Sequence, residues 1–361
     1  MQSIDEIYKH ILNGNKYVNK LYSNAKISKE FISNGQLKGS NINSISNNPY
    51  FPSEIKNYVI NSKKNQTNYQ AKIGDREILI KFFTFDNPNS NYLDSYANYV
   101  FIILFLLGKY TSKNCSKFLT INIYLTHFKK KFPKKLSDII DSINVNTGYS
   151  HIGCIDKSEV TIYRSEEWIK VLIHELFHNL NLDFSEENID KWKRELKSIF
   201  NIESKYCFYE TYCEIWARII NVIFNCFITL QERNQLGMSN FRNIFNYLIN
   251  VEREYSIQTA QRVYKNIAYN KNIMERTNVF CYYILVAVLF NNYRTFISWS
   301  KNNNINLLRF RKTKKNINSF FELLVEEFVN FQNNSDKGIS YKKYRKLPED
   351  SLRMTIIEEI S

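Results

Sequence analysis

Glycine and proline are scarce in this chain of 361 residues, which has only 9 glycines and 5 prolines. The sequence shows no long linker and no internal repeat, and this excludes a repeat protein. Hydrophobic residues make up 44% of the chain, a globular value that also excludes a disordered chain. The length allows a large core and one or two domains.

Cysteine is also too sparse for a disulfide framework, because there are six in 361 residues and no CxxC occurs. Cys207 and Cys213 lie six positions apart, which fits no zinc-finger spacing. We therefore expect free, mostly buried thiols and a reducing, cytoplasmic compartment.

No apolar run reaches the roughly 20 residues needed to span a bilayer. The longest runs are VFIILFLLG from Val100 and VFCYYILVAVLF from Val279, and both are interpreted as buried helices. The N-terminal stretch MQSIDEIYKHILNGNKY carries Asp5 and Glu6 and lacks an apolar h-region. We therefore expect no signal peptide and no membrane span.

Basic residues exceed acidic ones by 49 to 35, which gives a net charge of +14. Such a field favours anionic partners, although an AT-rich genome would raise the lysine content without any binding role. The basic stretches KKKFPKKL (129–136) and RFRKTKKN (309–316) are accompanied by no nucleic-acid motif and no Gly-rich phosphate loop. Nucleic acid is therefore not an expected partner.

The hydrophobic pattern predicts strands first and helices later. A hairpin is expected around Gly74-Asp75, alternating strands over 118–128 and 158–164, and a central helix from Ser165 as N-cap. Later helices are expected near 240–252, 255–269, 276–298 and 317–333. The predicted fold is α+β and zincin-like, a small mixed sheet packed on one helix followed by a mainly helical subdomain. The expected boundaries are 1–66 for an N-terminal helical and loop segment, 67–235 for the core, 236–335 for the helical subdomain and 336–361 for a peripheral tail.

Residues 171–182 read VLIHELFHNLNL and contain an HExxH motif made of His174, Glu175 and His178. Residues four apart share one helix face, so both imidazoles can bind one metal ion. Glu175 can then act as the base that takes a proton from water. The chain has five histidines and 24 glutamates, and the expected number of chance HExxH occurrences in a chain of this composition is roughly 0.005. The alternative is a pair of core histidines with Glu175 bonded to a neighbour.

A catalytic zinc site needs a third protein ligand. The metzincin pattern HExxHxxGxxH is excluded because Asn181 and Phe184 stand where it requires glycine and histidine. Asp183 is interpreted as a helix cap. Glu210 and Glu214 are four residues apart on one face of an apolar helix, where two carboxylates are costly unless a cation meets them. Both are therefore candidate ligands.

HELFH followed by a helix bearing Glu-x-x-Ala resembles the gluzincin class of zinc metallopeptidases over about residues 118–220. The resemblance implies a Zn²⁺ cofactor, with His174, His178 and Glu214 as ligands and Glu175 as catalytic base. Glu210 would orient a histidine or serve as the alternative ligand, and Arg218 would balance the two carboxylates. The Asn/Ile/Lys-rich composition with HELFH and Glu-x-Trp-Ala also resembles proteins of large DNA viruses, which implies the host cytoplasm or the virion as location.

The expected activity is hydrolysis of peptide bonds in a peptide or protein substrate, with acidic segments favoured if KKKFPKKL lines the cleft. Tyr282 is a candidate for stabilising the oxyanion, among several tyrosines that the sequence cannot separate. The alternative is a catalytically inactive binding or scaffold protein of zincin fold, with a basic surface for anionic partners. A fourth ligand such as Cys207 or Cys213 would favour that alternative, because it would close the metal site.

Overall fold

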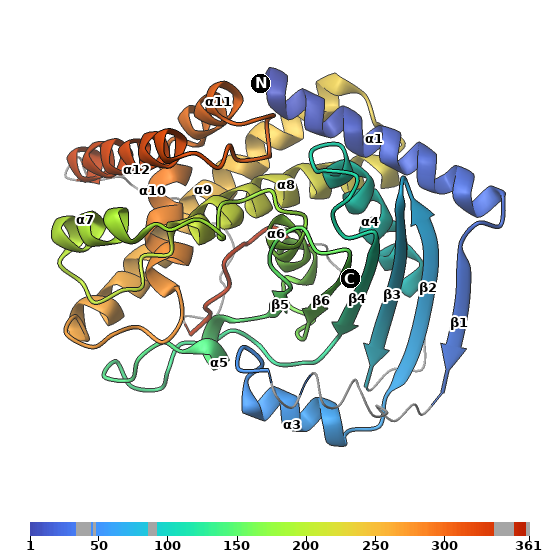
Figure 1. Ribbon diagram of the computed structural model, residues 1–361, viewed down its shortest axis with the longest axis horizontal. Helices are drawn as coiled ribbons and strands as arrows, with labels where there is room; N and C mark the ends of the chain where they lie inside the picture. Colours follow the sequence, from blue (N-terminus) through green and yellow to red (C-terminus); the bar gives the residue numbers. More distant parts are fainter. Residues whose placement is uncertain (34–44, 46–47, 86–91, 336–349, 359–361) are drawn as a thin grey trace. The chain divides into compact units, whose positions relative to one another are not determined.

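The computed structural model describes residues 1–33, 45, 48–85, 92–335 and 350–358 (Figure 1). The chain forms two compact units. The first, called the sheet unit, comprises Glu6–Lys129 and Asn146–Leu182; the second, called the helical unit, comprises Met1–Asp5, Lys130–Val145 and Asp183–Ser361. A mixed sheet in the N-terminal half and a mainly helical C-terminal region confirm the predicted α+β class.

The sheet unit contains a six-stranded sheet in the order β1-β2-β3-β4-β6-β5. The strands are β1 (Ser28–Ile32), β2 (Asn65–Ile73), β3 (Arg76–Thr84), β4 (Phe118–Tyr124), β5 (Gly148–Ser150) and β6 (Lys157–Ile162). The predicted hairpin is confirmed, because β2 and β3 pair antiparallel around Gly74, whose φ of +60° suits glycine. Strands β3, β4 and β6 are parallel, an arrangement that requires the long connections found between them.

Strand β5 lies at one edge of this sheet and pairs antiparallel with β6. It approaches its neighbours very closely at Gly148. A Cβ atom there would stand 2.7 Å from the Ile162 side chain and 2.8 Å from the Thr161 carbonyl oxygen. Only glycine therefore allows this edge strand to sit against β6 and the helix beside it.

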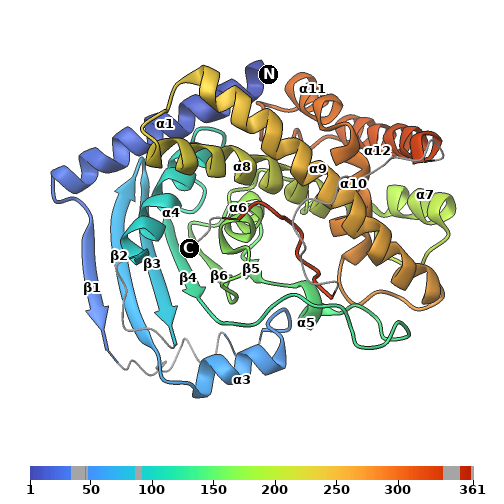
Figure 2. The same cartoon turned by 180° about the vertical axis from the view of Figure 1, so that it is seen from behind.

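The helices of the sheet unit are α1 (Gln2–Ser23, counted from Glu6), α3 (Ser53–Asn61), α4 (Tyr92–Gly108) and α6 (Trp168–Asn179). Helix α6 packs against β5 and β6 and also contacts α4 (Figure 2). All twelve residues of α6 are buried. The sequence predicted this central position, because apolar residues occupy nearly every side of the helix.

The start of α6 differs from the prediction, which placed the N-cap at Ser165. The helix begins at Trp168, and the residue before it, Glu167, has a left-handed φ of 59°. The Ser165 hydroxyl donates instead to the Thr126 carbonyl oxygen at 2.9 Å. Ser165 thus fastens the loop after β6 to the end of β4, and so cannot cap the helix.

A disulfide joins Cys115, just before β4, to Cys154, just before β6. The expectation of free thiols is therefore wrong for these two residues, while Cys207, Cys213, Cys226 and Cys281 are buried and are not part of a disulfide. The bond closes a loop over a sequence separation of 39 residues. Such a bond is unusual in a reducing cytosol, and the predicted compartment stays a prediction.

Replacing Cys115 and Cys154 together by serine should lower the free energy of unfolding by about 2–4 kcal/mol, because the bond restricts the unfolded chain. Urea denaturation followed by circular dichroism measures this loss. Reductant should destabilise the wild type by the same amount and leave the double variant unchanged. Wild type that is insensitive to reductant, with all six thiols alkylated in mass spectra, would contradict the bond.

The helical unit contains α5 (Ser142–Val145), α7 (Asp190–Phe200), α8 (Phe208–Glu232), α9 (Met238–Tyr269), the π-helix η1 (Phe280–Leu285), α10 (Val286–Asn291), α11 (Tyr293–Asn303) and α12 (Lys314–Ser335). Helices α8 and α9 pack side by side (Figures 1 and 2). The two helices predicted near 240–252 and 255–269 form one continuous helix, since neither glycine nor proline interrupts the sequence between them.

A buried ion pair links α8 to α9. The Arg218 Nε donates to Glu252 at 2.7 Å, and the two side chains are 2% and 0% exposed. Arg218 also donates to the Ser256 hydroxyl at 3.0 Å. The expectation that Arg218 balances Glu210 and Glu214 is thus not met, because its guanidinium group points to α9.

The last described segment, 350–358, is not helical, and Ser351, Leu352, Met354 and Thr355 in it are buried. Its backbone is held by side chains of three helices: Tyr283 donates to the Leu352 carbonyl at 2.6 Å, Tyr255 to that of Arg353 at 2.8 Å and Asn221 to that of Ile357 at 2.7 Å. The Ile356 amide donates to the second Glu252 oxygen at 3.0 Å. This part of the expected peripheral tail is therefore integrated in the core, whereas 336–349 lie outside the described residues.

Among the described helices, α8 is long and apolar enough to cross a membrane by length and composition, and Phe280–Asn291 with Tyr293–Asn303 passes the same test as a bent pair. In α8, 94% of the most apolar window is buried inside the protein. The core helix of a globular protein has the same properties, so α8 by itself says nothing about a membrane.

Candidate metal centre

The two histidines of HELFH face one another on α6. Their Nε2 atoms lie 3.3 Å apart, and both side chains are buried. The rings are close to perpendicular, with an interplanar angle of 73°. The spacing of four residues therefore brings both imidazoles to the same face of the helix, as the sequence predicted.

This distance fits metal coordination. Two nitrogens bound at 2.0–2.1 Å to one tetrahedral ion stand about 3.3 Å apart. Two neutral imidazoles are also the donor set that zinc and similar transition metals prefer. The spacing of His174 and His178 thus suits a shared metal ion as well as the hydrogen bond that joins the two rings here.

Glu175, the residue between the histidines, is buried and reaches the edge strand. Its Oε2 accepts a hydrogen bond from the Ser150 hydroxyl at 2.9 Å. Ser150 ends β5, and sequence reasoning missed it, because a single serine in a strand carries no signal of its own. The carboxylate is therefore directed to the edge of the sheet.

The C-terminal turn of α6 is hydrogen-bonded to the loops before β4 and β6 and to the start of β6 itself. The Asn179 Oδ1 accepts bonds from the hydroxyls of Ser116 at 2.8 Å and Ser158 at 3.3 Å. The Gly153 amide donates to the His178 carbonyl at 3.2 Å. Since Ser116 and Gly153 adjoin the two disulfide cysteines, the disulfide helps to hold the turn that carries His178.

Helix α8 carries the two predicted carboxylates, and both are buried. Glu210 lies in the first turn, where its Oε1 accepts a bond from the Asn278 amide at 3.2 Å. Thr211, the next residue, donates to the Cys281 carbonyl of η1 at 3.2 Å. A π-helix of this kind is often found near functional sites, and here it borders the turn that presents Glu210.

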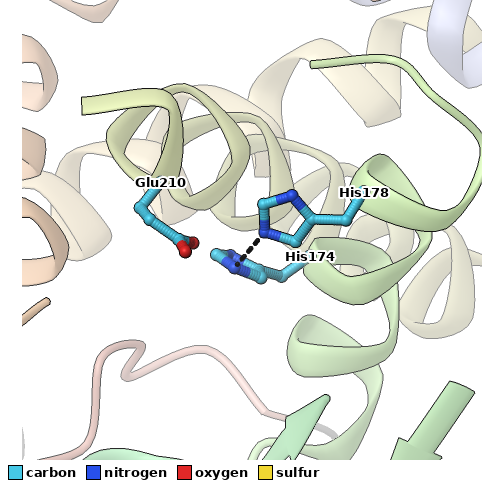
Figure 3. Close-up of side chains that lie close together, drawn as sticks. All are labelled: His174, His178 and Glu210. Atoms are coloured by element: carbon cyan, nitrogen blue, oxygen red, sulfur yellow. Dashed lines mark hydrogen bonds between the residues drawn. The ribbon is translucent and has the colours of Figure 1, made fainter. Parts of the chain in front are cut away.

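Three of the predicted residues form a group that could hold a metal ion. One ligand atom each of His174, His178 and Glu210 lies within 4.8 Å of the others, and Figure 3 shows the Glu210 carboxylate directed at the two imidazoles. Glu214, the preferred ligand from sequence, is not part of this group. The alternative ligand named in the sequence analysis is the one brought to the histidines, and ligation by Glu214 stays a prediction.

A second group shares His178 and adds Asp183 and Cys213, again with one ligand atom of each within 4.8 Å of the others. All three residues are buried. Asp183 was interpreted as a helix cap, but α7 begins only at Asp190. Carboxylate, imidazole and thiolate are all metal ligands, so this group is a second way to hold an ion.

The remaining candidate, Tyr282, is followed in η1 by Tyr283. Tyr283 is buried and its hydroxyl donates to the Leu352 carbonyl, so it is a core residue. Tyr282 is half-buried, and its backbone amide donates to the Asn278 carbonyl at 2.9 Å. Tyr282 thus lies one helical turn after Asn278, which donates to Glu210. The catalytic role expected for Tyr282 stays a prediction.

Comparison of the chain with protein-family models, with curated proteins and with solved structures gives no match in any of the three.

Proposed function

We propose that this protein is a zinc-dependent metallopeptidase. The observation that carries the proposal is the spacing of 3.3 Å between the Nε2 atoms of His174 and His178, with the Glu210 carboxylate beside them. The proposed ligands are these three residues. Three protein ligands and one open position are the arrangement found in catalytic zinc sites, whereas structural sites have four protein ligands.

A bound Zn²⁺ would polarise the scissile carbonyl and lower the pKa of a water molecule to about 7. Glu175 takes the proton from the attacking water and delivers it to the leaving amine. Its hydrogen bond from Ser150 holds the carboxylate toward the edge strand. A purely structural metal site would have no use for a base between its two histidines.

The proposed substrate is a peptide in extended conformation, added to the sheet along β5. Edge strands bind such segments through backbone hydrogen bonds. Strand β5 suits this role because it is an edge of the sheet and its last residue contacts the proposed base. A peptide placed there would have its backbone near Glu175.

Elemental analysis of the purified protein, followed by cleavage of a peptide library, tests the proposal. We expect one zinc per chain, and hydrolysis that a chelator abolishes and added zinc restores. The His174→Ala variant should lose both the metal and the activity. A folded wild-type protein that binds no metal would overturn the proposal.

Glu210 and Glu214 are separated by comparing their glutamine variants. Glu210→Gln should weaken zinc binding by at least about 10–100-fold. Mutation of a residue that only hydrogen-bonds to a metal ligand already has an effect of this size, and loss of a ligand should have a larger one. Glu214→Gln should retain near wild-type affinity and serves as the matched control on the same helix. Competition titration with a chromophoric chelator measures both affinities, and the reverse order would assign Glu214 as the ligand.

A second candidate function is a catalytically inactive binding protein with a structural metal ion. The group of His178, Asp183 and Cys213 favours it, since thiolate ligands are typical of structural sites. The cobalt-substituted protein discriminates between the two functions. A thiolate-to-cobalt absorption band that disappears in Cys213→Ser, without peptide cleavage by the zinc form, would favour the structural site.

A further inference from the structure

The helical unit has an open pocket of about 1390 Å³. It is lined by the first turn of α7, the end of α11 and the first turns of α12. The volume exceeds the 300–1,000 Å³ that is common for small-molecule sites. The pocket shares no residue with the HELFH helix or with α8, so it is a separate feature of the protein.

The lining is strongly basic. Five cationic side chains face two acidic ones, Asp190 and Glu322. The cationic residues are Lys191, Arg194, Arg311, Lys314 and Lys315. The lining therefore has an excess of three positive charges. These charges come from segments that are far apart in the sequence. Such a concentration of charge attracts anions.

One guanidinium group is fixed at the wall of this pocket. Arg311 donates through Nε to the Asn303 carbonyl and through Nη2 to the Asn304 carbonyl, both at 3.2 Å. These carbonyls position the group without neutralising its charge. A guanidinium held in one orientation loses little conformational freedom when it binds an oxyanion.

Helix α12, which has 22 residues, begins at the pocket. Thr313 caps the helix, because its Oγ1 accepts a bond from the Asn316 amide at 3.2 Å and its carbonyl accepts one from Ile317 at 2.9 Å. The first N–H groups of a helix have no partner within the helix, and its dipole is positive at this end. Both properties favour an anion in front of Lys314 and Lys315.

Independent support comes from the side chain of Asn316, which lines the pocket and is only 5% exposed. Its Nδ2 has no hydrogen-bond partner in the described part of the chain. Buried amide donors are almost always paired, because a missing acceptor is unfavourable. An oxyanion bound at the start of α12 would supply that acceptor.

We propose that this pocket binds a small ligand carrying several phosphate groups. Phosphate oxygens accept from a fixed guanidinium, from lysines, from helix N–H groups and from an amide donor at the same time. A compact anion with several charges matches the three excess positive charges better than a single carboxylate does. Inorganic polyphosphates and phosphorylated organic molecules share this chemistry.

Calorimetric titration at about 0.15 M salt tests the proposal, since this ionic strength screens the general attraction of the +14 chain. The probes are inorganic phosphate, tripolyphosphate and a nucleoside triphosphate. We expect tripolyphosphate to bind at least tenfold more tightly than phosphate. Tighter binding of the nucleotide would identify an organic phosphate as the ligand, and equal binding would identify the phosphate chain itself.

Two variants remove the pocket's donors. Asn316→Leu removes the amide without changing the charge, and Lys314→Ala with Lys315→Ala removes two charges; each should weaken tripolyphosphate binding at least tenfold. The matched control is Lys265→Ala with Lys271→Ala, two exposed lysines outside the lining, which should bind like wild type. Thermal unfolding verifies that each variant is folded.

Three outcomes would overturn the proposal. They are equal weakening in both lysine double variants, unchanged binding in Asn316→Leu, and tighter binding of a glutamate-rich peptide than of tripolyphosphate.

Discussion

Glu175→Gln should abolish most peptide hydrolysis and leave the metal in place. We expect kcat to fall by about 10²–10⁴-fold, the contribution of a positioned general base. Glutamine keeps the size of the side chain and an oxygen that accepts from Ser150, but it cannot take a proton from water. Because the residue is not a proposed ligand, the zinc content should stay at the wild-type value. Cleavage rates on one defined peptide, together with elemental analysis, measure both quantities.

Ser150→Ala is the control for this variant. It removes the hydrogen bond to Glu175 at 2.9 Å but keeps the carboxylate. We expect a smaller loss of kcat than in Glu175→Gln, with the same zinc content. Wild-type activity in Glu175→Gln would contradict the role of this carboxylate as base, even if the protein is a metallopeptidase.

Arg218→Met should have the largest effect on stability. The substitution leaves the Glu252 carboxylate buried without its cation, and we expect a loss of about 3–5 kcal/mol in the free energy of unfolding. Methionine fills much of the same apolar space beside Phe290, whose ring centroid lies 4.7 Å from the guanidinium carbon. The loss is therefore mainly electrostatic. Urea denaturation of purified variants measures it.

The double variant Arg218→Met with Glu252→Leu is the matched control. It removes both charges, and a buried ion pair exchanged for apolar residues is often nearly neutral. We expect it to be more stable than Arg218→Met alone, although the amide of Ile356 loses an acceptor. A double variant no more stable than Arg218→Met would show that packing, and not the uncompensated charge, accounts for the loss.

Local signals predicted much of the sheet unit. Gly74-Asp75 marked the hairpin, and alternation marked β4 and β6, because these features depend on neighbouring residues. The start of α6 was missed, since the Ser165 hydroxyl is engaged by Thr126, a residue 39 positions earlier. The disulfide was missed for the same reason: the spacing of Cys115 and Cys154 carries no motif, and only the meeting of two loops brings them together.

The HELFH site was predictable because its histidines are four residues apart on one helix. The third ligand was not, because Glu210 and Glu214 lie four residues apart on one helix face and no local signal in the sequence separates them. The contact of Ser150 with Glu175 and the basic pocket at the start of α12 both join segments that are distant in the sequence. The sequence shows the basic stretch RFRKTKKN (309–316), but not the pocket that this stretch lines together with residues of α7 and α11.

The segment 350–358 makes completion of the helical unit depend on residues that are synthesised long after the sheet unit. Every residue of the sheet unit has been made once Leu182 is added, whereas Glu252 receives its bond from Ile356 only after the chain has been extended to that residue. At roughly 5–20 residues per second, the intervening chain takes on the order of ten seconds or more to synthesise. During this interval the surfaces of α8 and α9 that the segment covers are open to chaperones on the ribosome.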